Sequence, residues 1–454
     1  MRGKIVEYFT KANIVTAIIF GLLAFATANI PRTSFYTFIG AYAVWFIFYL
    51  LICKNHTAQI EKEIGSSSSP IGFLKSLSAY QWIAILSRMV LIFSVPLLSD
   101  DVYRFIWDGQ IVAAGHNPFD YTPDWYMSHA HTIKNLNTDL YNQLNSKPFY
   151  TVYPPVCQAI FGVSAYIGGA SIKANIFCIK LFLLAFEIAT IIILPKILKQ
   201  FSINKNYAIV YLLNPLVIIE TIGNCHFEGI MVSLFLMAIY FFKKNNLTAS
   251  AILFALSILT KLITVLGLPI ILLLMPWCQR FLYSATIAMV ILISFSPIIN
   301  NTMLQHFTDS VGLYFNYLEF NASIYTLLKS WGWKIFNQDI TTKYGFILPL
   351  ISTAVIIYIY LQKHTRNFFT LLMAIFVVYY IFARTVHPWY LLPIILFGTM
   401  SGFRFPIWWS AIVAATYITY SVTPYQENYW LVLFEYITVL VYAGYELKAR
   451  RSRL

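Results

Sequence analysis

Apolar runs of about twenty residues recur along the whole chain and constrain its fold more than any other feature. Because a helix needs roughly 20 apolar residues to cross the hydrocarbon core of a bilayer, each run is a candidate span. Charged residues make up 11% of the chain, whereas soluble globular proteins carry about 25%. The sequence therefore predicts an all-α polytopic membrane protein.

The apolar runs predict about 13–15 transmembrane or re-entrant helices. Segment 154–171 is apolar, but a full crossing there would move the next basic stretch to the other side, so we expect a partial or re-entrant helix. We expect N-terminal helices (1–98) with a cytoplasmic loop (54–79), an external loop (99–153) and the remaining helices (154–454). The candidate spans are residues 12–30, 34–53, 80–98, 174–195, 206–223, 227–242, 247–260, 262–276, 281–299, 343–361, 368–386, 388–403, 405–422 and 429–446.

Basic residues gather in short loops and in the tail KARRSRL, and the net charge is +13. Cytoplasmic loops of membrane proteins carry such an excess of lysine and arginine, so this distribution orients the helices and argues against a nucleic-acid partner. If the N-terminus is cytoplasmic, a series of basic stretches is cytoplasmic as well. These stretches lie near Lys196, Lys243, Arg280, Lys363 and Arg404. We expect an integral protein of a bacterial inner membrane.

The same topology puts four polar stretches on the external side of the membrane. They are the loop 99–153, GNCHFEG at 223–229, the loop 300–342 and ARTVHPWY at 383–390, and Lys261 falls there too. Ionisable groups at membrane depth are costly and usually functional. Their convergence on one face predicts a single site on the external side.

The stretch SDDVYRFIWDGQ (99–110) holds three carboxylates and one arginine in twelve positions. Apolar residues recur at helical spacing along 101–113, and Asp101, Arg104 and Asp108 share a different face. Tyr103 and Trp107 are typical of the level of the lipid headgroups. We therefore expect a helix that lies along the external membrane surface, with Ser99 or Asp100 at its N-cap.

A structural interpretation of this stretch is also open. Asp100 could cap the helix while Asp101 and Asp108 pair with Arg104. However, Asp100 and Asp101 are adjacent and cannot both be satisfied by Arg104. They also begin a loop of about fifty residues, and long loops of this kind are often functional.

Six segments, in order, resemble the GT-C fold glycosyltransferases, and most closely the mannosyltransferase-like group around glycosyltransferase family 87 and the related glycolipid-anchor mannosyltransferases. The resemblance implies a GT-C fold, a polyprenyl-phosphate sugar donor with mannose favoured, and a catalytic base in the pair Asp100 and Asp101. Two positions depart from the family pattern, Gln110 after the WDG glycine and Glu228 at the end of the GNxHxD-like motif. The segments are SDDVYRFIWDGQIVAAGHNPF, TVYPPV, LNPLVIIETIGNCHFEG, LTKL, EFNASIYTLL and VHPWYLLP.

Transfer from a lipid-linked sugar needs a base for the acceptor hydroxyl, cations for the leaving phosphate and groups that orient the sugar. Asp100 is the first choice for the base and Asp101 the second. For the donor phosphate we expect Lys261, Arg384 and His387. For the sugar or acceptor we expect a larger set, namely Tyr103, Arg104, Asp108, His226, Glu228, Asn321, Tyr325 and Trp389.

Each of these residues also has a structural interpretation. Lys261 could be a lysine that reaches along its helix to water, and Arg384 an interfacial anchor. No cofactor is demanded by the sequence. Asp100, Asp101, His226 and Glu228 could supply ligands to a divalent ion, but no ligand spacing requires one, so the question of a metal stays open.

The sequence thus predicts an inverting glycosyltransferase acting at the external membrane face. Its expected partners are a polyprenyl-phosphate-linked sugar, a glycan or glycolipid acceptor and membrane lipid. The alternatives are a secondary transporter or lipid flippase, which would place charges near the bilayer midplane between repeated halves, and a non-catalytic subunit of a glycolipid-synthesis complex.

Overall fold

The computed structural model describes residues 11–60, 78–129, 132–316, 318–362, 367–422 and 424–451. Most of the expected cytoplasmic loop 54–79, Lys363 and the last residues of the tail lie outside the described residues. Within them the named elements are all helices, and the one isolated β-bridge pairs Phe320 with Thr385. The chain is an all-α polytopic membrane protein, as the sequence predicted.

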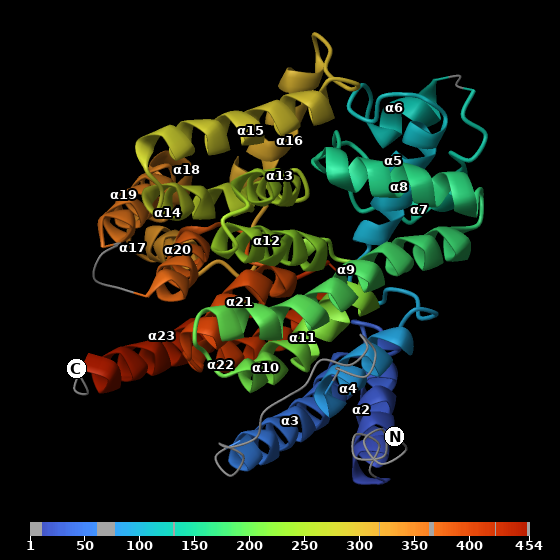
Figure 1. Cartoon of the computed structure of the whole chain (residues 1–454). Coiled ribbons are helices and arrows are strands. Elements are labelled where there is room, and N and C mark those ends of the chain that lie inside the picture. The colour runs from blue at the N-terminus through green and yellow to red at the C-terminus, as the bar shows by residue number, and fades with distance from the viewer. Residues whose placement is uncertain are drawn as a thin grey trace.

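The helices follow one another with short connections, apart from the region between α4 and α8 (Figure 1). The first part of the chain contains α2 (Lys11–Ala28), α3 (Phe35–Ile60), α4 (Ala79–Met89), α5 (Asp101–Ala113), α6 (Pro123–Ser128) and α7 (Thr138–Asn142). The middle part contains α8 (Pro155–Gly168), α9 (Ile172–Gln200), η2 (Lys205–Tyr207), α10 (Ala208–Leu212), α11 (Pro215–Ile218), η3 (Ile219–Gly223), α12 (Glu228–Lys243), α13 (Leu247–Ile258), η4 (Leu262–Gly267), α14 (Leu268–Leu273) and α15 (Trp277–Phe295). The last part contains α16 (Met303–Asn316), α17 (Ile324–Phe336), α18 (Thr341–Tyr344), α19 (Ile347–Leu361), α20 (Phe368–Phe382), η5 (Pro388–Leu391), α21 (Leu392–Ser401), α22 (Phe405–Ile412), η6 (Val413–Ser421) and α23 (Tyr429–Arg451).

Fewer helices are long enough to cross a membrane than the 13–15 segments expected. Among the described residues, five helices are long and apolar enough, or six if the bent pair 205–212 and 215–223 is one span, and six further apolar helices have 10–17 residues. The helix of the expected span 80–98 ends at Met89, and the chain continues in turns and irregular backbone. The expected span 206–223 is bent by 60°, because Asn214 caps a new helix that begins at Pro215. Apolar composition alone does not reveal such breaks.

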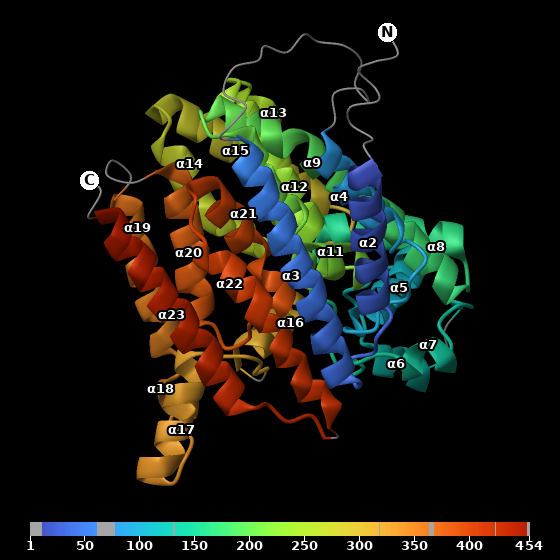
Figure 2. The ribbon, with the colours of Figure 1, turned by 90° about the horizontal axis from the view of Figure 1, so that it is seen from below.

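The long helices run up and down along roughly one axis, so the molecule has two distinct ends (Figure 2). The turn between α2 and α3 and the segment before α23 lie at one end, together with α6, α7, α17 and α18. The C-terminal end of α23 lies at the other. We name the first the loop end and the second the basic end.

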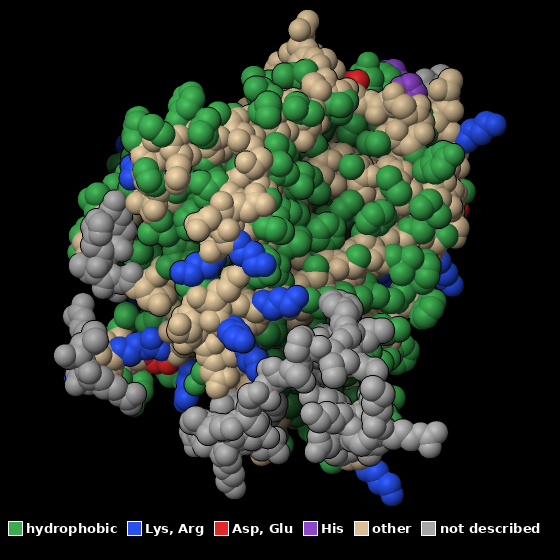
Figure 3. Space-filling view, viewed as in Figure 1, with side chains coloured by type: hydrophobic (Ala, Val, Ile, Leu, Met, Phe, Trp, Pro, Cys, Tyr) green, Lys and Arg blue, Asp and Glu red, His purple; other side chains and the backbone are tan. Residues whose placement is uncertain are grey.

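The basic end is defined by the residues that finish four helices. Lys54 lies near the end of α3, Lys199 near the end of α9, Lys243 at the end of α12, and Arg450 near the end of α23. Figure 3 shows lysine and arginine side chains grouped on one face, where aspartate and glutamate side chains are few. Such an excess of basic residues is typical of a cytoplasmic face.

Helix α5 has the expected bounds, and most of its side chains are buried in the protein. Trp107, expected at the headgroup level, is fully buried against Tyr126 and Tyr141. The helix packs against α8 so closely that a Cβ on Gly109 would lie 2.4 Å from the carbonyl oxygen of Phe161. Its residues Arg104 and Asp108 are therefore held inside the protein.

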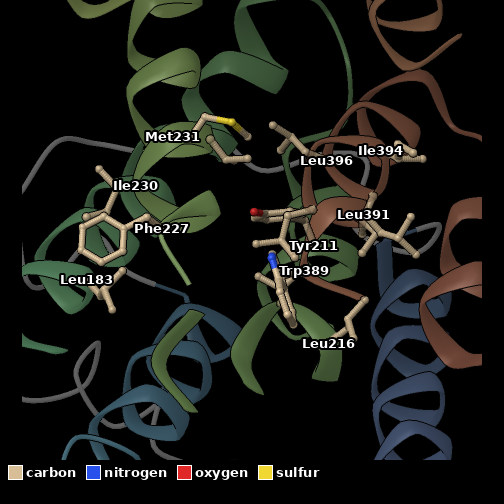
Figure 4. Close-up of a cluster of buried hydrophobic side chains, with 14 of the residues drawn as sticks. Leu183, Tyr211, Leu216, Phe227, Ile230, Met231, Trp389, Leu391, Ile394 and Leu396 are labelled. Carbon is tan, nitrogen blue, oxygen red and sulfur yellow. The ribbon is translucent and has the colours of Figure 1, made fainter. Parts of the chain in front are cut away.

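The core of the bundle lies among α9, α11, α12 and the η5–α21 segment. Figure 4 shows Leu183, Phe227, Met231, Leu391 and Leu396 in this apolar cluster. Trp389 lies in the same cluster, although it also borders the cavity described next. The site is thus built directly on the most rigid part of the fold.

Candidate functional site

A cavity of about 1700 Å³ lies where the loop end meets the bundle. Its walls come from the α2–α3 turn, the start of α5, the loop before α8, the starts of α12 and η4, and the segments before α17, η5 and α23. Residues almost 400 positions apart, with Arg32 the first and Glu427 the last, therefore line one cavity. Nine of the thirteen residues expected at the site line it: Asp100, Asp101, Arg104, Glu228, Lys261, Tyr325, Arg384, His387 and Trp389.

The two adjacent aspartates at the start of α5 have different surroundings. Asp100 occupies the N-cap position, yet its carboxylate makes no capping hydrogen bond and instead forms an ion pair with Arg32. Asp101 accepts a hydrogen bond from Asn145 Nδ2 at 3.2 Å. Burial raises the pKa of Asp101, while Asn145 and the positive charges of Lys261 and Arg32 oppose the rise. The two neighbouring carboxylates therefore differ in their partners, because Asp100 contacts a guanidinium and Asp101 an amide.

Lys261 lies beside the start of α12. Its Nζ is 2.9 Å from Glu228 Oε1, and it also lies 5.5 Å from the centre of the Tyr153 ring. The side chain of Lys261 is 24% exposed and that of Glu228 4%. The cation thus faces the cavity while its carboxylate partner is recessed in the wall.

Arg384 belongs to a separate charged cluster at the far wall. Its Nη2 is 2.7 Å from Glu319 Oε1, and Lys329 Nζ is 2.7 Å from the other oxygen of the same carboxylate. The guanidinium also stacks over the Tyr325 ring at 4.6 Å. Backbone hydrogen bonds between Phe320 and the strand-like segment 384–386 fix the two loops side by side.

Three rings stack at the back of the cavity. Trp389 lies between His226, at 3.6 Å between ring centres, and His387, at 4.4 Å. His387 borders the cavity, whereas His226 is 1% exposed and its Nε2 lies 3.5 Å from Glu220 Oε2. His226 therefore supports the wall instead of lining it.

Four expected site residues lie outside the cavity lining, and three have clear structural partners. Asp108 is fully buried, pairs with Arg104 Nε at 2.8 Å and accepts hydrogen bonds from Thr151 and Gln158. Asn321 is bound by the C-terminal segment. Tyr103 is half-buried on α5. The four are Tyr103, Asp108, His226 and Asn321.

Asn321 is held through its backbone and its side chain together. Its N–H donates to Glu427, its Nδ2 donates to Glu435 Oε1 at 3.0 Å, and its carbonyl accepts from Tyr436 Oη at 2.8 Å. Its φ of 49° lies in the left-handed region, which asparagine tolerates. The C-terminal segment therefore positions the loop that carries Glu319.

Several cavity residues were missed by the sequence analysis. Arg32 follows the first span, and the expected topology already placed that turn outside. Glu319 lies two positions before Asn321, in the segment EFNASIYTLL that carries part of the family resemblance. The centre of the Tyr420 ring lies 4.5 Å from Arg32 Cζ. Nothing in the sequence pointed to Tyr420, because a tyrosine in an apolar run resembles any interfacial aromatic residue.

A buried polar network lies behind the acidic pair and was also missed. Glu220 accepts hydrogen bonds from Tyr417 Oη at 2.8 Å and Asn224 Nδ2 at 3.2 Å. Asn224 in turn accepts from the backbone N–H of Leu98 at 3.3 Å. This network joins η3 to the segment that leads into Asp100 and Asp101. Glu220 lies in a π-helical stretch, a geometry found frequently at functional sites.

Among the described residues, no three histidine, cysteine, aspartate or glutamate side chains form a group that could hold a metal ion. The cavity carboxylates are instead paired with cations or hydrogen-bond donors. The residues present can therefore position an anion and accept a proton.

Comparison with known proteins gives one family and one relative. The family described as "Alpha-(1->6)-mannopyranosyltransferase, N-terminal domain" matches residues 11–277. A protein of Corynebacterium glutamicum, alpha-(1->6)-mannopyranosyltransferase A, is 24% identical over 182 residues, which cover 40% of this chain and 36% of that protein. The chain thus spans about a third of the length of this relative. No solved structure matches.

Proposed function

The chain belongs to the alpha-(1->6)-mannopyranosyltransferase family, and from that premise we propose that it transfers mannose from a polyprenyl-phosphate donor to a glycan or glycolipid acceptor. One observation carries the proposal. Carboxylates and cations from seven separate segments line a single cavity at the loop end of a membrane-spanning bundle. A secondary transporter would instead need its charges near the midplane.

The charge distribution supports action at the external face. Helices α3, α12 and α23 all have one end near the cavity and finish with basic residues at the other end. Basic ends belong in the cytoplasm. The cavity then opens on the external side, at the level where a lipid-linked phosphate would lie.

In the proposed reaction the acceptor hydroxyl attacks the anomeric carbon of mannose. The bond between that carbon and the phosphate oxygen breaks, and its electron pair leaves with the polyprenyl phosphate. The hydroxyl proton passes to Asp101, whose raised pKa suits it to this task. Direct displacement inverts the configuration without a covalent enzyme intermediate, in contrast to retaining glycosidases.

The assignment of Asp101 rests on its surroundings. Asp100 was the first choice from the sequence, but its carboxylate is occupied by the Arg32 guanidinium, so it is less accessible to an acceptor hydroxyl than Asp101. Lys261, near Asp101, would offset the negative charge that develops on the leaving phosphate. Glu228 and Tyr153 hold that lysine at the cavity wall.

The test is a transfer assay with the purified protein in lipid nanodiscs. Radiolabelled mannosyl polyprenyl phosphate should give labelled product, whereas a nucleotide-linked mannose should not. Asp101→Asn should lower kcat by about 10²–10⁴-fold, the usual contribution of a general base. Asp139→Asn, on an exposed position of α7 in the same loop, is the matched control and should keep full activity.

Two results would contradict the proposal. Transfer from the nucleotide sugar alone would remove the lipid donor. Undiminished transfer by both Asp101→Asn and Asp100→Asn, at unchanged thermal stability, would remove the acidic pair from catalysis. Uptake of labelled sugar into vesicles without any transfer would favour a transporter.

A further inference from the structure

Arg32 lines the cavity, but neither the sequence nor the family comparison indicated it as a site residue. It lies in the turn between α2 and α3, and its backbone N–H donates to the carbonyl of Leu97 at 3.2 Å. Its guanidinium stacks over Tyr420 and reaches Asp100. The first helical hairpin thus presents a guanidinium directly beside the acidic pair.

Four cations line the cavity among the described residues, and they are not equally available to a ligand. Arg104 is 3% exposed, pairs with Asp108, and donates to the carbonyls of Ser146 and Phe149. Arg384 shares the Glu319 carboxylate with Lys329. These two cations are tied into internal clusters.

Arg32 and Lys261 are different because they flank Asp101. Both positive charges act on the Asp101 carboxylate, while Arg384 does not figure among the charges that do so. The partner of Arg32, Asp100, is itself 35% exposed and borders the cavity. A ligand entering the cavity can therefore reach both members of this pair.

We propose that Arg32 binds the phosphate of the lipid donor, and that Asp100 holds the guanidinium in place until the phosphate replaces it. The planar guanidinium fork fits a phosphate as well as it fits a carboxylate. The inference rests on the proposed lipid donor. It adds a binding residue from the α2–α3 turn and gives the two adjacent aspartates different tasks.

Tyr420 and Tyr425 make the exchange feasible without a large movement. Arg32 Cζ lies 4.5 Å from the centre of the Tyr420 ring and 5.9 Å from that of Tyr425. An aromatic face attracts a guanidinium irrespective of which oxygen anion the fork contacts. The stem of Arg32 can stay on these rings while its donors turn from Asp100 to the phosphate.

The proposal predicts opposite effects for the two members of the pair. Arg32→Ala removes the donors, so the Kd for a polyprenyl monophosphate should rise about tenfold or more, the usual effect of losing a charged hydrogen-bond donor. Asp100→Asn removes the competing negative charge, so the same Kd should fall severalfold. Arg32→Lys should lie between wild type and Arg32→Ala.

The experiment measures binding of polyprenyl monophosphate to the full-length protein in nanodiscs, with the uncharged polyprenol as the control ligand. Arg280→Ala is the control variant, because Arg280 on α15 is half-buried, donates to the carbonyl of Met275 and does not line the cavity. Tighter binding by Asp100→Asn cannot come from misfolding. This variant and Arg32→Lys therefore decide the matter if Arg32→Ala does not fold.

Unchanged binding by the Arg32 variants would overturn the proposal. So would equal weakening by Arg32→Ala and Asp100→Asn, which indicates a purely structural ion pair. If wild type binds polyprenol as well as the phosphate, or neither, the proposed donor fails instead. The two failures are therefore distinguishable.

Discussion

Two groups of ion pairs in this molecule use the same residue types but differ in their surroundings. Arg88 and Glu187 join α4 to α9, with 2.7 Å between Nε and Oε2 and side chains 0% and 1% exposed. Arg104 and Asp108 are similarly enclosed within α5. The pairs of the cavity wall, such as Lys261 with Glu228, are close as well but border open space.

The comparison teaches that accessibility, more than the pairing distance, separates the two groups. Removing one member of an enclosed pair leaves the opposite charge buried without its counter-ion. A pair at the cavity wall can exchange its partner for an anionic ligand. We therefore expect the enclosed pairs to determine stability and the cavity pairs to determine donor binding.

The largest effect is expected for the enclosed pair between α4 and α9. Arg88→Met should lower the free energy of unfolding by about 3–5 kcal/mol, because Glu187 would remain buried without its cation. Thermal unfolding in detergent measures this, with Lys173→Met on the exposed face of α9 as the control. The double variant Arg88→Met with Glu187→Leu should recover most of the loss. A small loss of stability in Arg88→Met would contradict the expected difference between enclosed pairs and cavity pairs.

Lys261→Ala should act on donor binding instead. The Kd for a polyprenyl monophosphate should rise by about 10–100-fold, equivalent to about 1.5–3 kcal/mol for a lost charged hydrogen bond. Acceptor KM and the melting temperature should change much less. Equal loss of donor and acceptor binding, together with a lower melting temperature, would place Lys261 with the enclosed pairs.

A smaller effect is expected in the pH dependence of transfer. Asp101 must be ionised to act as a base, so activity should rise as pH increases through its raised pKa. Lys261 lowers that pKa through its positive charge. Lys261→Ala should therefore move the acidic limb of the kcat profile to higher pH by about one unit. Lys173→Met should leave the limb in place, and an unmoved limb in Lys261→Ala would separate Asp101 from the proton transfer.

The sequence was sufficient for the fold class and for the gathering of distant segments. Positive-inside topology placed loop 99–153, Lys261 and segment 383–390 on one side without any knowledge of contacts. The bounds of single helices were harder. Breaks at Met89 and at Asn214 depend on local capping and packing, which a hydropathy pattern averages out.

The partners of individual charges could not be predicted. The sequence indicated that Asp101 and Asp108 share a helical face with Arg104, but only the fold shows that Arg104 takes Asp108 and that Asn145 takes Asp101. It also gave no means of pairing Asp100 with Arg32, which lies 68 positions earlier. Such long-range pairs depend on tertiary contacts that one sequence does not reveal.

The hydrogen bonds that hold Asn321 come from a different part of the chain than the residues around the acidic pair. Residues 11–277, which match the family, include Asp101 and Lys261, whereas Glu427, Glu435 and Tyr436 fasten the opposite wall from beyond that region. Substitutions in α23 can therefore change the shape of this cavity wall without changing Asp101 or Lys261. The two walls of the cavity can therefore vary separately, because different parts of the chain supply them.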